Sequence, residues 1–438
     1  MAEHFALSRR AALGGLAASI LSSAAYSQAI AAEGDGIELR DLSVPFDHSI
    51  TGGDQFTLRY GLLSPFNARR RTIFVVADGQ QFYVTPKAFA PSTRPIFINE
   101  FNVVGIFGRA DAPDVQARVG AGTAVDWQQA YRLLRADQWI GDIEAVRHAL
   151  LGPNGLIGLY GRSGGAFLVH QYMAQHGARV DRLFTQAAVN PFLEARLGIS
   201  SDHFWQELGP DDRARLSSVM ASGRYPRIRV SRLFQRQNFF VDRAGVPAAR
   251  TALIDDLAEG RGERLATRET EYQINSLDQL DRTPRGAASR VRLFEFIAPM
   301  SVNFRRDTDR LRPNLEVAAD FAEPVMQLLR AGKIEMPAMD FAALHRCTAR
   351  AVIIAGRWDH TCDYRTQIAL AASYPAGELI LLDDDHVFHR LQQSGQAPAL
   401  VRAALGEGGP AGFAMALNKI IDLRWSESGL LEPAQLKD

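Results

Sequence analysis

Five consecutive residues, Gly161-Arg162-Ser163-Gly164-Gly165, fit the pattern G-x-S-x-G. An apolar run at 156–160 precedes them and a helix-compatible stretch at 166–175 follows. The pattern therefore predicts a serine on a sharp turn between a strand and a helix. Such a turn lifts the hydroxyl group clear of the sheet, and the flanking glycines permit the strained backbone that this exposure requires. Ser163 is the candidate nucleophile.

A serine of this kind needs a base and an orienting acid, because an unassisted hydroxyl group is a poor nucleophile at neutral pH. The apolar run 351–355 leads into Asp359, and the apolar run 378–382 leads into His386. Both residues thus follow a predicted strand at its carboxyl end, the edge of a parallel sheet where active sites lie. The chain order serine, acid, histidine also suits such a sheet. We predict a triad of Ser163, Asp359 and His386, with His386 as the general base.

Other residues compete for two of these roles. Asp363 is the alternative acid, and His360 and His389 are the alternative bases. Asp359 also suits the cap of a following helix, and the acidic run 383–385 suits a solvated turn. The serine, the acid and the histidine occur in the right order, and each lies at the end of its own predicted strand. This combination favours the triad over these separate interpretations. We expect the remaining histidines, including His170, His176 and His203, to be surface or packing residues.

Nucleophilic attack on a carbonyl group also needs backbone N–H groups that bind the developing oxyanion. Gly164 follows the nucleophile directly and supplies one such group. The second is expected from the loop after the predicted strand 72–77. Gly79 and Gln80 are the two candidates in that loop, and the sequence does not distinguish them.

Composition describes an ordinary globular chain. It has 438 residues, of which 47% are apolar and 22% charged, and its 49 basic and 49 acidic residues give a formal net charge of zero. No long block of one charge sign occurs, so neither a nucleic-acid groove nor an anionic membrane patch is indicated. Neither a nucleic acid nor a membrane surface is therefore an expected partner.

Cysteine and glycine patterns give no indication of a cofactor or a metal. The two cysteines, Cys347 and Cys362, are too widely spaced for a C-x-x-C redox or zinc motif, and no H-E-x-x-H, Walker or G-x-G-x-x-G pattern occurs. The predicted strand 351–355 lies between them and places the two thiols near its opposite ends. We therefore expect them to remain unpaired.

The N-terminus has the features of an export signal. Ser8-Arg9-Arg10 precedes an uncharged stretch at 11–32, and Ala29-Ile30-Ala31 offers a small-residue cleavage site. This pattern predicts a twin-arginine signal at 1–31, read by the twin-arginine export machinery. The alternative is a membrane anchor, but the clearly apolar part, 11–25, is shorter than the roughly 20 residues that span a bilayer. We expect a periplasmic or secreted protein without a stable membrane span after the signal is removed.

Strand and helix patterns alternate on either side of a long helical stretch. This alternation predicts an α/β core with a mostly parallel, doubly wound sheet, interrupted by a helical insertion without convincing strands. The predicted parts are the signal at 1–31, the first part of the core at 37–191, the helical cap at 192–344 and the second part of the core at 345–425. The predicted core elements are strands at 37–46, 55–63, 72–77, 102–107, 156–160, 180–189, 351–355 and 378–382, and helices at 127–151, 166–175, 364–373 and 397–423.

On these residues the chain resembles the α/β-hydrolase family, specifically its proline iminopeptidase and tripeptidyl aminopeptidase branch. The resemblance covers most of 55–405. The stretch from Asp142 to Arg147 and the G-x-S-x-G turn are similar to the branch's helix and elbow, and Gly356-Arg357-Trp358-Asp359 resembles its acid loop. The family's fold, the α/β-hydrolase fold with a helical cap, is what the resemblance implies.

Two motifs depart from that branch. Phe107-Gly108-Arg109 stands where the branch usually carries a D-Q-R-G turn and retains only the arginine. Ala77-Asp78-Gly79-Gln80-Gln81 stands where the branch carries its H-G-G-P-G oxyanion motif. The resemblance is therefore stronger for the fold than for the substrate.

The resemblance implies acyl transfer in two steps, and three hypotheses follow. The first is an aminopeptidase-like enzyme acting on short peptides, in which a cap carboxylate such as Glu295 anchors the substrate's amine; a salt bridge to a nearby arginine is the alternative role for Glu295. The second is an esterase or lactonase acting on a small apolar ester. The third is a non-catalytic binding protein. An unpaired carboxylate near Ser163 favours the first, and a wholly apolar pocket favours the second.

Overall fold

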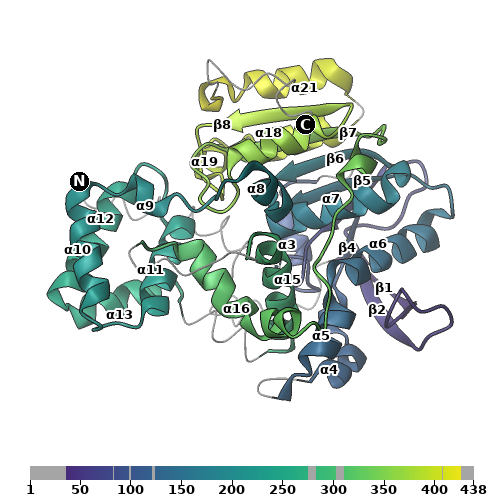
Figure 1. Cartoon of the computed structure of the whole chain (residues 1–438). Coiled ribbons are helices and arrows are strands. Elements are labelled where there is room, and N and C mark those ends of the chain that lie inside the picture. Colours follow the sequence, from purple (N-terminus) through teal and green to yellow (C-terminus); the bar gives the residue numbers. More distant parts are fainter. Residues whose placement is uncertain are drawn as a thin grey trace.

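The computed structural model describes residues 36–81, 83–97, 100–120, 124–274, 283–301, 310–406 and 408–425. A sheet with helices on both faces stands beside a separate group of helices (Figure 1). Across these residues no helix is both long enough and apolar enough to cross a membrane. The predicted signal at 1–31 lies outside the described residues.

Eight strands form one sheet in the order β1-β2-β4-β3-β5-β6-β7-β8. β2 pairs in antiparallel fashion with β1 and β4, and every other pair is parallel. The predicted α/β class with a mostly parallel, doubly wound sheet is confirmed. The strands are β1 (Glu38–Pro45), β2 (Gln55–Leu62), β3 (Thr72–Val76), β4 (Asn102–Ile106), β5 (Ile157–Arg162), β6 (Val180–Gln186), β7 (Arg350–Gly356) and β8 (Gly377–Leu382).

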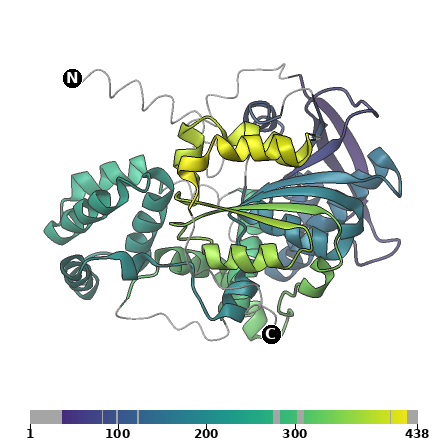
Figure 2. The same ribbon diagram turned by 90° about the horizontal axis from the view of Figure 1, so that it is seen from above.

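Each face of the sheet has its own apolar cluster. Along β3, Phe74 and Val76 belong to one cluster, whereas Ile73 and Val75 belong to the other, as the alternation of a strand requires. α6, α7 and α18 cover the first face, and α3, α20 and α21 cover the second; Figure 2 shows α18 and α21 on opposite sides of the sheet. The core helices are α3 (Phe89–Thr93), α4 (Pro113–Val119), α5 (Trp127–Leu134), α6 (Ala136–Leu151), α7 (Gly164–His176), α18 (Tyr364–Ala372), α19 (His389–Gln393), α20 (Ala397–Leu405) and α21 (Gly409–Asn418).

The chain between β6 and β7 is helical, and its described part contains no strand. We call residues 192–344 the cap. Its helices are α8 (Pro191–Leu197, which begins one residue earlier), α9 (Phe204–Glu207), α10 (Pro210–Ala221), α11 (Arg227–Phe240), α12 (Val246–Glu259), α13 (Gly262–Glu271), α15 (Pro284–Ser301), α16 (Pro313–Arg330) and α17 (Phe341–Leu344).

The cap has an inner and an outer part. α15 and α16 contribute residues such as Val291 and Val325 to the apolar cluster of the sheet's first face. α9 to α13 enclose a cluster of their own, which includes Phe204, Phe234 and Leu253. Figure 1 shows this outer group standing away from the sheet. The outer part therefore has a separate core, whereas the inner part is an extension of the main one.

The predicted helix at 127–151 is two helices, α5 and α6, with Arg135 between them. Arg135 has an extended backbone (φ −66°, ψ 162°). The backbone N–H of Ala136, at the start of α6, donates to Glu295 Oε1 of the cap at 2.9 Å. An orphan N–H at the start of a helix needs such an acceptor. The break is thus stabilised by a residue distant in the sequence.

A buried ion pair connects α6 to the turn after β4. The Arg109 side chain is fully buried and donates from Nε and Nη2 to the two carboxylate oxygens of Asp142, at 2.9 and 2.7 Å. Nη1 donates to the carbonyl oxygens of Phe46 and Leu133. Burial by itself raises the pKa of Asp142, but Arg109 and His48 hold it below its usual value. Arg109, the arginine that stands where the aminopeptidase branch has its D-Q-R-G turn, is thus a structural residue.

We predict that Arg109→Met lowers the free energy of unfolding by about 3–5 kcal/mol, because it removes the guanidinium that pairs with both carboxylate oxygens of the buried Asp142 and leaves only the imidazole of His48 as its partner. Denaturant unfolding of the purified protein measures this change. Arg59→Met is the matched control, since Arg59 pairs with Asp41 on the surface, and it changes stability by less than about 1 kcal/mol. Equal effects of the two substitutions would contradict the prediction.

Candidate active site

Ser163 lies on a strained turn between β5 and α7. Its backbone has φ 52° and ψ −122°, a combination that residues with a side chain rarely adopt. Its N–H donates to the carbonyl oxygen of Gln186 on the neighbouring strand at 2.8 Å. A Cβ atom at Gly161 would lie 2.8 Å from Gly165 O, and one at Gly165 would lie 2.4 Å from Val76 O. Both glycines are required because the turn brings backbone against backbone.

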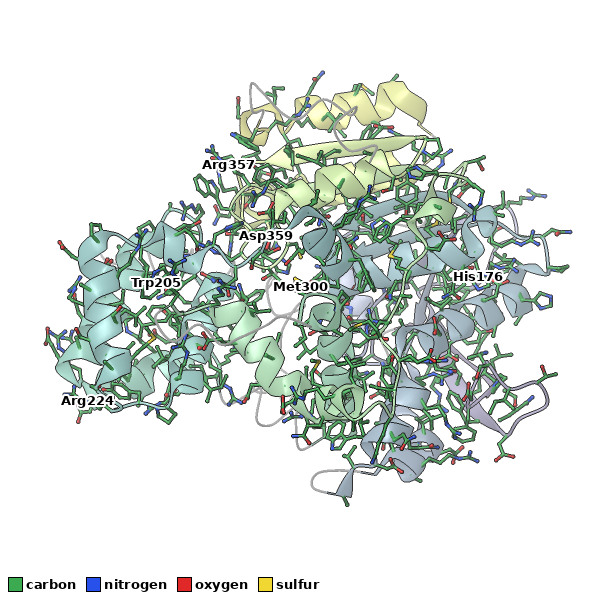
Figure 3. The ribbon with its side chains drawn as sticks, in the orientation of Figure 1. His176, Trp205, Arg224, Met300, Arg357 and Asp359 are labelled. Carbon is green, nitrogen blue, oxygen red and sulfur yellow. The ribbon has the colours of Figure 1, made fainter. Side chains whose placement is uncertain are left out.

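The structure brings the three predicted catalytic side chains together. His386 Nε2 lies 3.1 Å from Ser163 Oγ, and His386 Nδ1 lies 2.8 Å from Asp359 Oδ2. The second carboxylate oxygen of Asp359 accepts from the N–H groups of Thr361 and Cys362 at 2.7 and 2.8 Å. The two N–H bonds hold the Asp359 carboxylate in place. The carboxylate in turn orients the imidazole of His386, which contacts the Ser163 hydroxyl group. Figure 3 shows Asp359 where the second part of the core faces the cap.

Electrostatics at His386 favour its protonated form. Burial lowers the pKa of the imidazole, but the Asp359 carboxylate outweighs it and raises the pKa above its usual value. The ring of Phe239, from the cap helix α11, lies edge-on to the imidazole with 5.4 Å between ring centroids. The histidine is therefore shielded by the cap and prepared to accept a proton.

The alternative residues occupy other positions. His389 Nδ1 pairs with Asp385 at 2.6 Å. Asp363 caps α18 by accepting from the N–H of Arg365, and it also pairs with His203. His360 Nε2 lies 3.2 Å from Glu207 of the cap. No hydrogen bond within the described residues joins any of these alternatives to Ser163.

The oxyanion loop distinguishes Gly79 from Gln80. The N–H of Gln80 donates to Asp78 Oδ1 at 3.1 Å, which favours Gly79 as the second donor. Gly164 begins α7, where the N–H groups of the first turn have no partner within the helix. The α-carbon of Gly79 is close to α15, since a Cβ atom there would lie 2.9 Å from that of Ala288. The cap thus packs directly on the oxyanion loop.

Asp78 is a functional candidate that the motif comparison alone does not reveal. Its side chain is buried, and its Oδ2 atom has no hydrogen-bond partner among the residues that the structure describes. That atom points at the first residue of the elbow helix, because a Cβ atom on Gly164 would lie only 2.1 Å from it. The nearest cation is Arg292, whose Nε atom is 3.5 Å away. A carboxyl group therefore stands beside the proposed oxyanion site.

The charge balance around Arg292 bears on the protonation of Asp78. Arg292 also forms an ion pair with Glu295 and lies within 3.3 Å of Gln171. One buried guanidinium thus faces two buried carboxyl groups, and burial raises the pKa of both Asp78 and Glu295. Two like charges in one buried cluster disfavour each other. Burial therefore favours the protonated form of Asp78, the more loosely paired acid, more than it would for an exposed aspartate.

Glu295 does not have the unpaired carboxylate that an amine anchor needs. One oxygen accepts from Ala136 N–H and the other is paired with Arg292. The side chain is buried in this cluster, and it is not among the residues that line the cavity at Ser163. The salt bridge, the alternative role named for Glu295, is what the structure contains.

A cavity of about 500 Å³ lies between the cap and the core and includes Ser163 and His386 in its lining. This volume suits a small-molecule ligand. Figure 3 shows Met300 of α15, one of its lining residues, near the centre of the molecule between cap and core. Its apolar lining includes Ile96, Val189, Phe239, Leu293, Phe296, Ile297, Met300, Val317, Phe321 and Leu391, and its charged or titratable lining includes Arg162, Glu194, Asp202, Arg236, His360 and His386.

Two acids of the cavity wall are held by hydrogen-bond donors. Glu194 accepts from the hydroxyl and backbone N–H groups of Ser201, and burial raises its pKa to about 7. Asp202 accepts from the N–H groups of Asn314 and Leu315 at the start of α16, and burial raises its pKa to about 6. Neither has a salt bridge to a cation among the described residues. Both acids position the cap, and burial makes each of them harder to ionise than an exposed carboxyl group.

Both cysteines are free, buried thiols. The Sγ atom of Cys362 lies near the triad: its possible metal-binding atom and those of Asp359 and His386 are all within 4.8 Å of one another. Asp359 and His386 already bond to each other and to the groups described above. The arrangement therefore has a complete explanation as a triad.

No protein-family model and no curated protein matches this sequence. Solved structures to which the chain is similar include Rv0554 from Mycobacterium tuberculosis (14% identity, 84% of this chain and 100% of that chain, TM-score 0.44). Others are a thermophilic esterase from Thermogutta terrifontis (14%, 82% and 96%, TM-score 0.40) and the esterase RhEst1 from Rhodococcus sp. ECU1013 (15%, 84% and 99%, TM-score 0.41). The fold is that of the α/β-hydrolases. Its defining features are the strand order of the sheet, the strained serine turn between β5 and α7, and the helical segment between β6 and β7.

We predict that Asp78→Asn extends activity to higher pH. As the pH rises through the raised pKa of Asp78, the wild-type protein gains a negative charge beside Gly164 that opposes the oxyanion, whereas asparagine stays neutral. Below that pKa the two proteins resemble each other. The pH profile of kcat/KM measures this, with a difference of about tenfold expected on the alkaline side.

The control for this substitution is Asp41→Asn, which removes an exposed carboxylate paired with Arg59 and leaves the profile unchanged. Superimposable profiles for wild type and Asp78→Asn, with equal thermal stability, would show that the protonation of Asp78 has no effect on the reaction.

Proposed function

We propose that the protein is a serine hydrolase that cleaves a carboxylic ester through an acyl-enzyme. The observation that supports this proposal is the chain of hydrogen bonds from Asp359 through His386 to Ser163, on a strained turn at the floor of a largely apolar cavity. Nucleophile, base and acid come from three separate segments of the core. This is the geometry of an activated nucleophile.

The reaction follows from these positions. Ser163 Oγ attacks the carbonyl carbon while His386 Nε2 takes the hydroxyl proton, and the N–H groups of Gly79 and Gly164 bind the oxyanion. His386 returns the proton to the departing alcohol as the carbonyl re-forms. Water then attacks the acyl-serine while His386 takes its proton. His386 gives this proton to Ser163 Oγ as the acyl bond breaks, which releases the acid and restores the enzyme. Asp359 holds the imidazole in the required tautomer throughout and stabilises its positive charge.

The state of the cap carboxylates favours an ester over a peptide with a free amine. Glu295 is engaged by Arg292, and Glu194 and Asp202 are engaged by donors and have raised pKa values. A substrate ammonium group needs an ionised, available carboxylate. An ester with an apolar portion needs only the oxyanion donors and the apolar lining.

An aminopeptidase is the second candidate, and one observation favours it. Glu194 and Asp202 line the cavity and have no cation partner among the described residues. A bound ammonium group would lower the pKa of a neighbouring carboxyl group and ionise it. Under this candidate Glu194→Gln raises KM for arylamide substrates and leaves kcat for aryl esters unchanged.

We also propose that the protein is exported by the twin-arginine route to the periplasm or the exterior. The support is the sequence of 1–31, with Arg9-Arg10 before the uncharged stretch and Ala29-Ile30-Ala31 at its end. Cell fractionation of a strain that expresses the full chain tests this proposal. Replacing Arg9 and Arg10 with lysine is expected to retain an uncleaved protein in the cytoplasm.

Ser163→Ala is expected to abolish labelling by a fluorophosphonate probe and to lower kcat for short-chain aryl esters by roughly four to six orders of magnitude. Ser218→Ala, on the surface helix α10, serves as the control and keeps both. Proline and alanine arylamides are assayed in parallel. Turnover of esters alone supports the proposal, and arylamide turnover transfers the assignment to the aminopeptidase. Absence of labelling in folded wild type would favour the non-catalytic binding protein.

A further inference from the structure

Arg236 is a buried cation that has no counter-charge among the described residues. It lies on the cap helix α11, lines the cavity that contains Ser163, and has no exposed surface. In the part of the chain that the structure describes, its Nη1 and Nη2 atoms have no hydrogen-bond partner. Burial alone lowers its pKa, to about 10, with no acid contributing. The guanidinium therefore remains charged at neutral pH.

An arrangement of this kind is costly in a folded protein. Removing a guanidinium from water without a partner costs several kcal/mol, and buried polar groups are almost always hydrogen-bonded. The ring of Phe240, 4.8 Å from the guanidinium carbon, offsets part of this cost. A bound anion would remove the rest of this unfavourable free energy.

The orientation of Arg236 is already fixed. Its Nε atom donates to the carbonyl oxygen of Tyr272 at 2.9 Å, and the Phe240 ring supports one face. The two terminal nitrogens remain, and they form the fork that binds the two oxygens of a carboxylate. An arginine held by its inner nitrogen loses little conformational entropy when it binds a ligand.

The chemistry of the surrounding wall agrees with a polar ligand. Gln235, Asn314 and His360 also line the cavity. Within the described residues, Gln235 Oε1, Asn314 Oδ1 and His360 Nδ1 have no hydrogen-bond partner. Glu194 and Asp202, in the same lining, disfavour a doubly charged group such as phosphate. A single carboxylate is the anion that one guanidinium matches.

We propose that Arg236 binds a carboxylate of the substrate. The enzyme then acts on esters whose acyl part or alcohol part carries a free carboxylate. This inference depends on the proposed esterase function for its catalytic consequence, but the binding site itself does not. The apolar residues of the cavity then contact the part of the substrate between the carboxylate and the scissile ester.

The test compares matched substrates. The mono-4-nitrophenyl ester of glutaric acid carries the carboxylate on the acyl side, 4-acetoxybenzoate carries it on the leaving group, and the 4-nitrophenyl ester of pentanoic acid carries none. Wild type is expected to prefer one of the two anionic esters. Arg236→Met is expected to lower kcat/KM for that ester by about tenfold to a hundredfold, mainly through KM, and to leave the neutral ester unchanged.

Three controls keep the outcome interpretable. Arg229→Met removes another arginine of α11, one that pairs with Glu269 away from the cavity, and leaves the preference intact. Arg236→Lys retains the charge without the fork and has an intermediate effect. Fluorophosphonate labelling of each variant shows that Ser163 is still activated and the fold preserved.

Calorimetry with glutarate separates the binding site from catalysis. Ser163→Ala is expected to bind glutarate, and Ser163→Ala combined with Arg236→Met is expected to lose that binding. If the wild type cleaves no ester but glutarate binds in an Arg236-dependent manner, the proposed function fails and the carboxylate site stands. Equal kcat/KM values for the anionic and neutral esters, together with no glutarate binding, would overturn the inference.

Discussion

The active site depends on one strained residue, Ser163, whose backbone holds a left-handed conformation that costs about 1–3 kcal/mol. Three features of its environment compensate for this strain. The serine N–H bonds to the next strand, the two flanking glycines allow the helix α7 to pack against β3 and β5, and the apolar helix is itself buried. The position of the Ser163 hydroxyl group therefore depends on contacts with neighbouring strands of the sheet as well as on the turn itself.

A second cluster connects this turn to the cap. Arg292 of α15 lies between Asp78 of the oxyanion loop and Glu295, and Glu295 in turn accepts the first N–H of α6. The charges are nearly all inaccessible to water, so each partner depends on the others. The inner cap is consequently part of the scaffold of the site. The outer helices α9 to α13 have a separate apolar core, and α11 adds Phe239 and Arg236 to the cavity lining. The same sequence segment thus contains two parts with different roles.

The sequence was sufficient to predict the sheet and to bring Ser163, Asp359 and His386 together, because residues after parallel strands meet at one edge. The sequence was not sufficient where a residue distant in the chain determines the local structure. The break before Ala136 depends on Glu295, 159 residues further along the chain, and no local signal interrupts the helical pattern there. Arg236 is one of four arginines in α11, and only the packing reveals that its terminal nitrogens are unpartnered. Asp78 was visible in the sequence as a motif difference, but its environment was not.

The bond between Ser163 and His386 joins residues 223 positions apart, with the whole cap between them. Contacts of such sequence separation carry a larger loop-closure cost than contacts between residues close in the chain. The strand, turn and helix of the elbow are contiguous in the sequence, whereas the histidine lies far beyond them. Because a chain is made from its N-terminus, the ribosome completes the elbow segment long before it adds His386. Ser163 therefore has no base until most of the chain has been synthesised.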